Sequence, residues 1–163
     1  MFYRVTSEVF IKSTSEKVWK LISTPKYLEK VHPFCKKNTI LDIKDKKIKK
    51  DLLVYNNGLN YIRIFKNWKN GIGYDLLVGK EKGKKSLVKW TINPHSEGAK
   101  LTISILPYTS DKIHRIFRPF VYYFIIRPGL KKYLFSVLNG IKWVAENDTN
   151  VQKNQFGMHP WFT

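Results

Sequence analysis

The sequence has a single cysteine, Cys35, and no long uninterrupted run of apolar residues. One cysteine cannot form an intrachain disulfide, so nothing argues for an oxidising compartment and a cytoplasmic location is the simpler expectation. The first residues, MFYRVTSE, lack the apolar core of a secretory signal, so we expect no signal peptide. Arg118 and Arg127 interrupt the most apolar region, so we expect no membrane-spanning helix either.

Signatures of catalysis and metal binding are also lacking. The sequence has no glycine-rich phosphate loop and no nucleophile motif, and its four histidines are scattered rather than paired at metal-ligand spacing. Cys35 follows His32 by three residues, which matches no catalytic motif, and a lone cysteine usually behaves as a small apolar residue. We therefore expect no catalytic residue, no bound metal and no cofactor.

Acidic residues are scarce relative to basic ones. The chain has 12 Asp and Glu against 30 Lys and Arg, a net charge of +18 at pH 7 that would attract polyanions or anionic membranes. Most of the basic residues are lysines, however, and a specific nucleic-acid site would use more arginine for bidentate contacts to phosphates and bases. We do not expect nucleic acid as a partner, and rank a nucleic-acid-binding function third.

Aromatic residues are abundant. The chain of 163 residues is 43% hydrophobic and 15% aromatic, which is enough for one domain with a buried core. Five Trp, nine Tyr and ten Phe must line either a dense core or the wall of a pocket.

Alternating apolar residues and turn residues predict an antiparallel sheet. Leu101, Ile103 and Ile105 alternate with polar residues, as in a strand with one buried face. Short turns rich in Asn, Asp and Gly separate successive strands, so neighbours in sequence pair antiparallel. The expected strands are residues 3–12, 38–44, 47–55, 59–68, 72–79, 84–93 and 98–107.

Two short helices are predicted between the first and second strands. Ser15 with Glu16 begins the first, with a Ser or Thr available as its N-cap. Pro25 suits the first turn of the second helix, and Pro33 closes it.

The C-terminal third predicts a long helix that covers the sheet. Apolar residues from Leu130 to Ala145 recur at helical spacing, and Pro128 fits the first turn. Residues 111–126 form a further helical candidate that Pro119 interrupts.

Several segments resemble the START-like superfamily, also called polyketide cyclase/dehydrase and lipid transport (SRPBCC). Besides the order of elements, the matching segments are SEKVWKLIS at 15–23, TPKYL at 24–28, HP at 32–33 and LNGIK at 138–142.

The resemblance covers about residues 3–147 and implies an α+β helix-grip fold. In this fold a seven-stranded antiparallel sheet curves around a long C-terminal helix, with two short helices after the first strand. The aromatic block at 116–126 departs from the family pattern. We expect a START-like domain over residues 1–147 and a tail, 148–163, that packs on it through Trp161 and Phe162.

The resemblance further implies a cavity between sheet and helix that encloses a hydrophobic small molecule or lipid. Binding or transport without catalysis is the leading function, and a cyclase/aromatase-type enzyme acting in the same cavity is the alternative. Ordinary core packing competes with a ligand role for each aromatic residue, and contact with the preceding helix's last carbonyls competes for His32. The predicted ligand contacts are Trp19, His32, Phe34, Tyr61, Tyr74, Trp90, Ile103, Phe124, Leu134, Leu138 and Ile141.

Residues 113–132 combine dense aromatic surface with basic groups, and two interpretations stay open. The segment is a lid that also touches an anionic membrane, or its apolar sides are buried against the sheet and the partner of a homodimer. The candidates for membrane contact are Arg115, Arg118, Arg127, Lys131 and Lys132.

Overall fold

Seven strands form one antiparallel sheet in the computed structural model, which describes residues 3–163. Their order is β1-β7-β6-β5-β4-β3-β2, so the last six form a meander and β1 pairs with the final strand. The sheet prediction is confirmed, although the second strand begins three residues earlier and the sixth is shifted by two. The strands are β1 (Val5–Ile11), β2 (Cys35–Lys44), β3 (Lys47–Tyr55), β4 (Asn60–Lys69), β5 (Gly73–Gly79), β6 (Ser86–His95) and β7 (Gly98–Leu106).

Helices α1 (Ser15–Ser23) and α2 (Leu28–Val31) follow β1. As predicted, a threonine caps α1: the side chain of Thr14 accepts a hydrogen bond from the N–H of Lys17. The prediction for Pro25 is wrong. It lies in a turn closed by the N–H of Tyr27 on the carbonyl of Thr24, and the positive φ of 62° at Lys26 delays the helix until Leu28.

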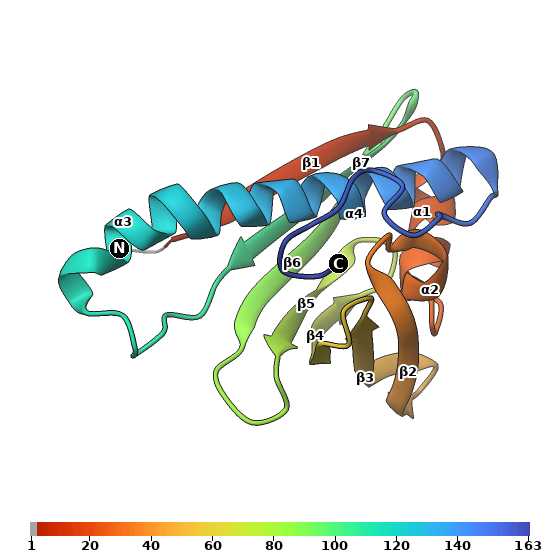
Figure 1. The fold of residues 1–163 in the computed structure, drawn as a ribbon. Helices are drawn as coiled ribbons and strands as arrows, with labels where there is room; N and C mark the ends of the chain where they lie inside the picture. Colours follow the sequence, from red (N-terminus) through yellow and green to blue (C-terminus); the bar gives the residue numbers. More distant parts are fainter. Residues whose placement is uncertain (1–2) are drawn as a thin grey trace.

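The long helix α4 (Arg127–Asn147) runs along the concave side of the sheet (Figure 1). Its middle touches the backbone of α2. A Cβ built on Gly140 would lie 1.9 Å from the carbonyl oxygen of Val31, so only glycine allows this approach. Close helix-helix contact, and not a void, is therefore the reason for a glycine inside α4.

An arm precedes α4 and extends beyond the sheet (Figure 1). It consists of η1 (Arg115–Phe117), α3 (Arg118–Val121) and η2 (Tyr122–Ile126), and it continues into α4. The predicted interruption at Pro119 is wrong, because this proline lies in the first turn of α3, where its missing N–H is not needed. Pro128 has no N–H to donate to the carbonyl four residues before it. The wider π-helical turn of η2 accommodates this proline, so the helix does not break.

The chain after α4 folds back over α2 toward the space between helix and sheet (Figure 1). The N–H of Val151 donates to the carbonyl of Lys30 at 2.9 Å, and Trp161 packs its ring on Gly129. Phe162 is buried and stacks on Tyr55 with ring centroids 4.4 Å apart. The last residues thereby contribute side chains to the interior.

Replacing Gly140 by alanine tests the contact between α2 and α4. Alanine would normally stabilise a helix interior by about 1 kcal/mol, but here its methyl group would overlap the Val31 carbonyl. We expect Gly140→Ala to lower the free energy of unfolding by about 1–3 kcal/mol in urea titrations. Asn139→Ala, at the neighbouring half-buried position, is the control and should change stability by less than about 0.5 kcal/mol. Equal stability of both variants would contradict the contact.

Candidate functional site

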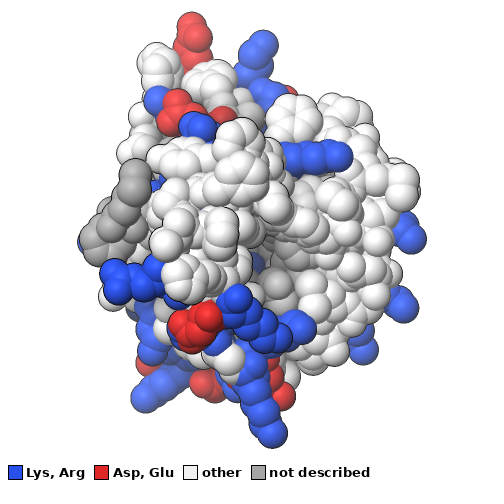
Figure 2. All heavy atoms as spheres, turned by 60° about the vertical axis from the view of Figure 1, so that its left-hand side comes forward, with Lys and Arg blue, Asp and Glu red and all other residues white. Residues whose placement is uncertain are grey.

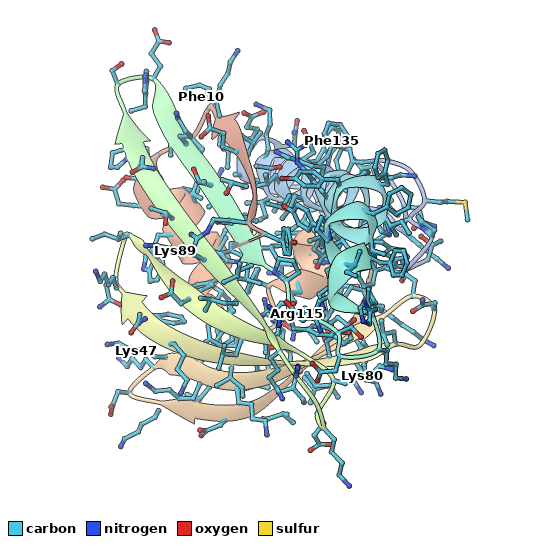
Figure 3. All side chains as sticks on the ribbon, turned by 90° about the vertical axis from the view of Figure 1, so that its left-hand side faces the viewer. Phe10, Lys47, Lys80, Lys89, Arg115 and Phe135 are labelled. Carbon is cyan, nitrogen blue, oxygen red and sulfur yellow. The ribbon has the colours of Figure 1, made fainter. Side chains whose placement is uncertain are left out.

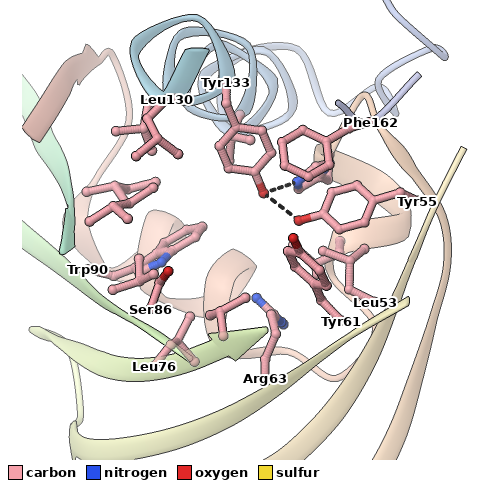
Figure 4. A pocket seen from close by; sticks show the side chains of 18 residues that line it. Leu53, Tyr55, Tyr61, Arg63, Leu76, Ser86, Trp90, Leu130, Tyr133 and Phe162 are labelled. Atoms are coloured by element: carbon pink, nitrogen blue, oxygen red, sulfur yellow. Dashed lines mark hydrogen bonds between the residues drawn. The ribbon is translucent and has the colours of Figure 1, made fainter. Parts of the chain in front are cut away.

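A cavity of about 90 Å³ lies between α4 and the concave face of the sheet (Figure 4). Its wall is mostly apolar, and the strands β3 to β7 supply most of it. Helices α2 and α4 and the buried ring of Phe162 complete the enclosure. The sheet and the helix therefore do not fill the space between them.

A larger chamber of about 280 Å³ adjoins the cavity beneath the arm. Tyr61, Ser86, Leu130 and Phe162 line both spaces, so they form the boundary between inner cavity and outer chamber. The outer walls include side chains of the arm and of the segment that links β7 to it.

Five of the eleven residues predicted to contact a ligand line the cavity, namely His32, Tyr61, Trp90, Ile103 and Leu134. His32 is the C-cap of α2, but its ring does not contact the last carbonyls of that helix. Its Nδ1 accepts from the N–H of Phe34 at 3.2 Å, and its Nε2 lies 2.9 Å from the hydroxyl of Tyr133.

The other six predicted residues lie outside this cavity. Leu138 and Ile141 come after Leu134 on α4, where the close approach of α2 fills the space. Phe124 is 69% exposed on the arm.

The remaining three of these six are aromatic residues that pack elsewhere. Tyr74 is buried behind the cavity, where its hydroxyl donates to the carbonyl of Ile22. Phe34 is buried beside His32, and Trp19 packs edge-on against Trp68 at 5.3 Å. For these residues core packing is the better description.

The most polar feature of the interior is an ion pair that the sequence analysis missed. Arg63 and Asp51 are directly opposite each other on β4 and β3 and are almost fully buried. The guanidinium donates to both carboxylate oxygens, from Nε at 2.8 Å and from Nη2 at 2.6 Å. Its Nη1 donates to the hydroxyl of Tyr27 at 2.9 Å, and Figure 4 shows the guanidinium directed toward the cavity.

This ion pair keeps Arg63 charged despite its burial. Burial by itself lowers the pKa of Arg63, but the adjacent Asp51 carboxylate and the Tyr27 hydroxyl outweigh it and hold the pKa well above its ordinary value. Part of the signal for the pair was present in the sequence, because Asp51 and Arg63 are equidistant from the predicted turn. Apolar residues occur on both alternating faces of their strands, so the pattern did not show which face is buried.

A second polar chain joins His32, Tyr133 and Tyr55. Because the Phe34 N–H donates to Nδ1, the neutral ring carries its hydrogen on Nε2 and donates it to Tyr133. The hydroxyls of Tyr133 and Tyr55 are 3.2 Å apart. Burial and the nearby charge of Arg63 lower the pKa of His32 to about 3, so the ring is neutral at pH 7.

The cavity has hydrogen-bond donors to spare. The chain of His32, Tyr133 and Tyr55 holds three polar hydrogens and uses two, so one hydroxyl remains free to donate. Arg63 uses three of the five N–H bonds that a guanidinium carries. The buried Nε1 of Trp90, which is 5% exposed, has no hydrogen-bond partner among residues 3–163.

The ionisable groups in and beside the cavity wall keep one protonation state near neutral pH. Burial raises the pKa of Tyr55 and of Tyr133 well above the ordinary range of tyrosine. Cys35, near the cavity, has a pKa raised to about 12 by burial and by Glu29. Within the described part of the chain no three His, Cys, Asp or Glu side chains gather as a metal site would require. The arrangement presents hydrogen-bond donors to the enclosed space.

The neutral state of His32 makes stability depend on pH. Its pKa is about 3 in the folded chain against 6.5 ordinarily, so only the unfolded chain takes up the proton between these values. The contribution of His32 to the free energy of unfolding is fully present above pH 6.5. Below pH 6.5 it falls by about 1.4 kcal/mol per pH unit. We expect His32→Gln to flatten the slope of unfolding free energy between about pH 6.5 and 5. His114→Gln, at an exposed residue just before the arm, should leave the slope unchanged; equal slopes for all three proteins would contradict a buried neutral His32.

Two variants test the buried ion pair. Arg63→Met leaves the Asp51 carboxylate buried without its partner and should cost about 3–5 kcal/mol of unfolding free energy in urea. The double variant Asp51→Leu/Arg63→Met removes both charges, so we expect it to recover most of that loss. Additive losses in the double variant would show that the two charges do not interact.

No protein-family model and no curated protein matches the sequence, but solved structures match the fold. A START superfamily protein from Mycobacterium smegmatis superposes with a TM-score of 0.70 at 14% identity, over 90% of this chain and 99% of that one. Ara h 8.0201 superposes with a TM-score of 0.63 at 12% identity, over 87% and 96% of the two chains. DynU16, in the dynemicin biosynthetic locus, has a TM-score of 0.64 at 11% identity, over 90% of this chain and 48% of that one. The seven-stranded sheet that curves around one long C-terminal helix is therefore the START-like helix-grip fold.

Proposed function

We propose that this chain binds and carries a hydrophobic small molecule or lipid in the cavity beneath α4, without catalysing a reaction on it. The observation that carries the proposal is the buried N–H of Trp90, which has no partner among residues 3–163, in a mostly apolar wall. A buried donor without a partner costs about 1–3 kcal/mol, and a ligand acceptor placed against it would recover this energy.

The spare donors define the class of ligand. The free N–H bonds of Arg63, the N–H of Trp90 and one hydroxyl of the Tyr133–Tyr55 pair suit a carboxylate or carbonyl oxygen. The remainder of the molecule would be apolar, because it would contact side chains such as Ile103 and extend toward the outer chamber. Each Å² of apolar surface that leaves water contributes about 25 cal/mol to binding.

The electrostatics favour this carrier over a cyclase-type enzyme. An acid or base catalyst works best with a pKa near the working pH. The pKa of His32 is about 3, and the pKa values of Tyr55 and Tyr133 are raised well above their ordinary range. These groups position a ligand more readily than they exchange protons with it.

The distribution of lysines supports a carrier over a nucleic-acid-binding protein. A nucleic-acid site needs cations concentrated on one face, with exposed aromatic residues between them. Lysines instead occur on most elements, namely β2, β3, β4, β6, β7, α1, α2 and α4, and Figure 3 shows Lys47 on β3, Lys89 on β6 and Lys80 after β5 at separate places.

Three probes with the same ten-carbon chain and different polar ends test the proposed ligand class. Decanoate has only acceptors, decanol has both, and decylammonium has only donors. We expect decanoate to bind most tightly and decylammonium most weakly in isothermal titration calorimetry, because the cavity supplies donors. If none of the three probes binds, or if decylammonium binds most tightly, the proposal is contradicted.

Trp90→Phe isolates the contribution of the indole N–H, since it removes the donor and keeps an aromatic ring. We expect about a tenfold weaker affinity for decanoate, the loss of one hydrogen bond to a charged acceptor. Trp68→Phe is the matched control, because its Nε1 bonds to Asn70 at 2.9 Å and the ring does not line the cavity. Equal affinities of the two variants would show that Trp90 does not contact the ligand.

A further inference from the structure

The arm carries large apolar side chains on its outer face. We define the apolar patch as Ile116, Phe117, Phe120, Tyr123, Phe124, Ile125 and Phe135. Ile116 is 76% exposed and Phe120 60% exposed, although such side chains are mostly buried in water-soluble proteins. Figure 2 shows a broad area without charged side chains here, with a hollow beside it. A continuous apolar area of this kind indicates an interaction surface.

The inner face of the arm is already occupied. Tyr122 is buried, stacks on Tyr3 with ring centroids 4.4 Å apart, and donates its hydroxyl to the carbonyl of Arg4. Val121 and Ile126 line the outer chamber. The apolar patch therefore cannot turn inward without giving up these contacts, and its side chains remain at the surface.

Basic groups flank the apolar patch, and acidic groups are rare near it. Asp111 is the only acidic residue between Gly98 and Ala145, and it already pairs with Lys84 at 2.6 Å. Arg115, Arg127 and Lys132 are exposed and form no ion pair with any residue in the described chain. Arg115 on the arm and Phe135 on α4, both labelled in Figure 3, are exposed.

Two of the five predicted membrane-contact residues are engaged with the protein itself. Arg118 donates from Nε to the carbonyl of Ile113 at 3.0 Å and lines the outer chamber. Lys131 donates to the carbonyl of Thr6. Of the five, Arg115, Arg127 and Lys132 are therefore the ones available to a partner.

We propose that the apolar patch docks the protein on an anionic lipid bilayer. Its aromatic side chains enter the boundary between headgroups and acyl chains, while Arg115, Arg127 and Lys132 contact lipid phosphates. A second copy of this chain fits less well, because a two-fold contact through the same patch would bring these cations close to their own equivalents. The proposal rests on the surface alone and holds whatever the cavity contains.

Flotation with lipid vesicles tests the docking. Vesicles of phosphatidylcholine with about one third phosphatidylserine should carry the protein at low ionic strength, and pure phosphatidylcholine should carry much less. Raising the salt to about 0.5 M should weaken the binding, because ions screen the attraction between cations and phosphates.

Two pairs of variants with matched controls assign the binding to the patch. Phe120→Ser/Phe124→Ser should lower the vesicle partition coefficient about tenfold, since two neighbouring rings no longer insert. Its control, Leu41→Ser/Ile43→Ser, removes comparably exposed apolar groups from β2 at the far edge of the sheet and should bind normally. The vesicle partition coefficient of Arg115→Gln/Arg127→Gln should also fall about tenfold. The control Lys47→Gln/Lys89→Gln has the same net charge, and its partition coefficient should fall much less.

The proposal is overturned if the native protein fails to float with anionic vesicles at low salt. It is equally overturned if the patch variants and their controls bind alike. A dimer in sedimentation that Phe120→Ser/Phe124→Ser converts to a monomer, without any vesicle binding, would assign the patch to a second copy of the chain instead.

Discussion

The bidentate pair of Arg63 and Asp51 is the interaction on which the interior depends. A guanidinium can stay buried only where a carboxylate compensates its charge, and the register of β3 and β4 puts these two side chains directly opposite each other. The bond from Arg63 to Tyr27, and from Tyr27 to Tyr74, extends the network to the segment between α1 and α2 and to β5. One polar cluster thereby fixes the floor of the cavity and leaves part of the guanidinium directed into it.

The same charge determines what the rest of the cavity can do. Burial, together with this charge, keeps His32 neutral, so His32 supplies a fixed donor to Tyr133 instead of a titrating group. Hydrogen-bond donors without a partner in the described chain then face a mostly apolar space, and the N–H of Trp90 is one further donor. A wall of this composition suits a molecule with an apolar body and an oxygen acceptor at one end.

The sequence predicted the fold well and the site only in part. Alternation, turn residues and helical spacing are local signals, so all seven strands and the terminal helix could be found from them. The long side chains near the middle of α4 could not be assigned to cavity or core, because the approach of α2 to Gly140 decides this and is a contact between distant segments. Arg63 was missed because a basic residue in a lysine-rich chain is expected at the surface, and apolar residues on both faces of β4 did not indicate which face is buried. The apolar end of the tail predicted that Phe162 packs on the domain, but its place in the cavity wall depends on the path of the whole tail, which no local pattern predicts.

The central claim is that the space between the sheet and α4 exists to hold a small molecule. Native mass spectrometry of the gently purified protein, followed by extraction and identification of what is released, tests this claim most directly. We predict a co-purifying compound with an apolar body and an oxygen acceptor, present in much lower amount on the Trp90→Phe variant. A protein that carries no small molecule, with solution NMR showing the rings of Trp90 and Tyr133 in direct contact across a collapsed interior, would contradict the claim.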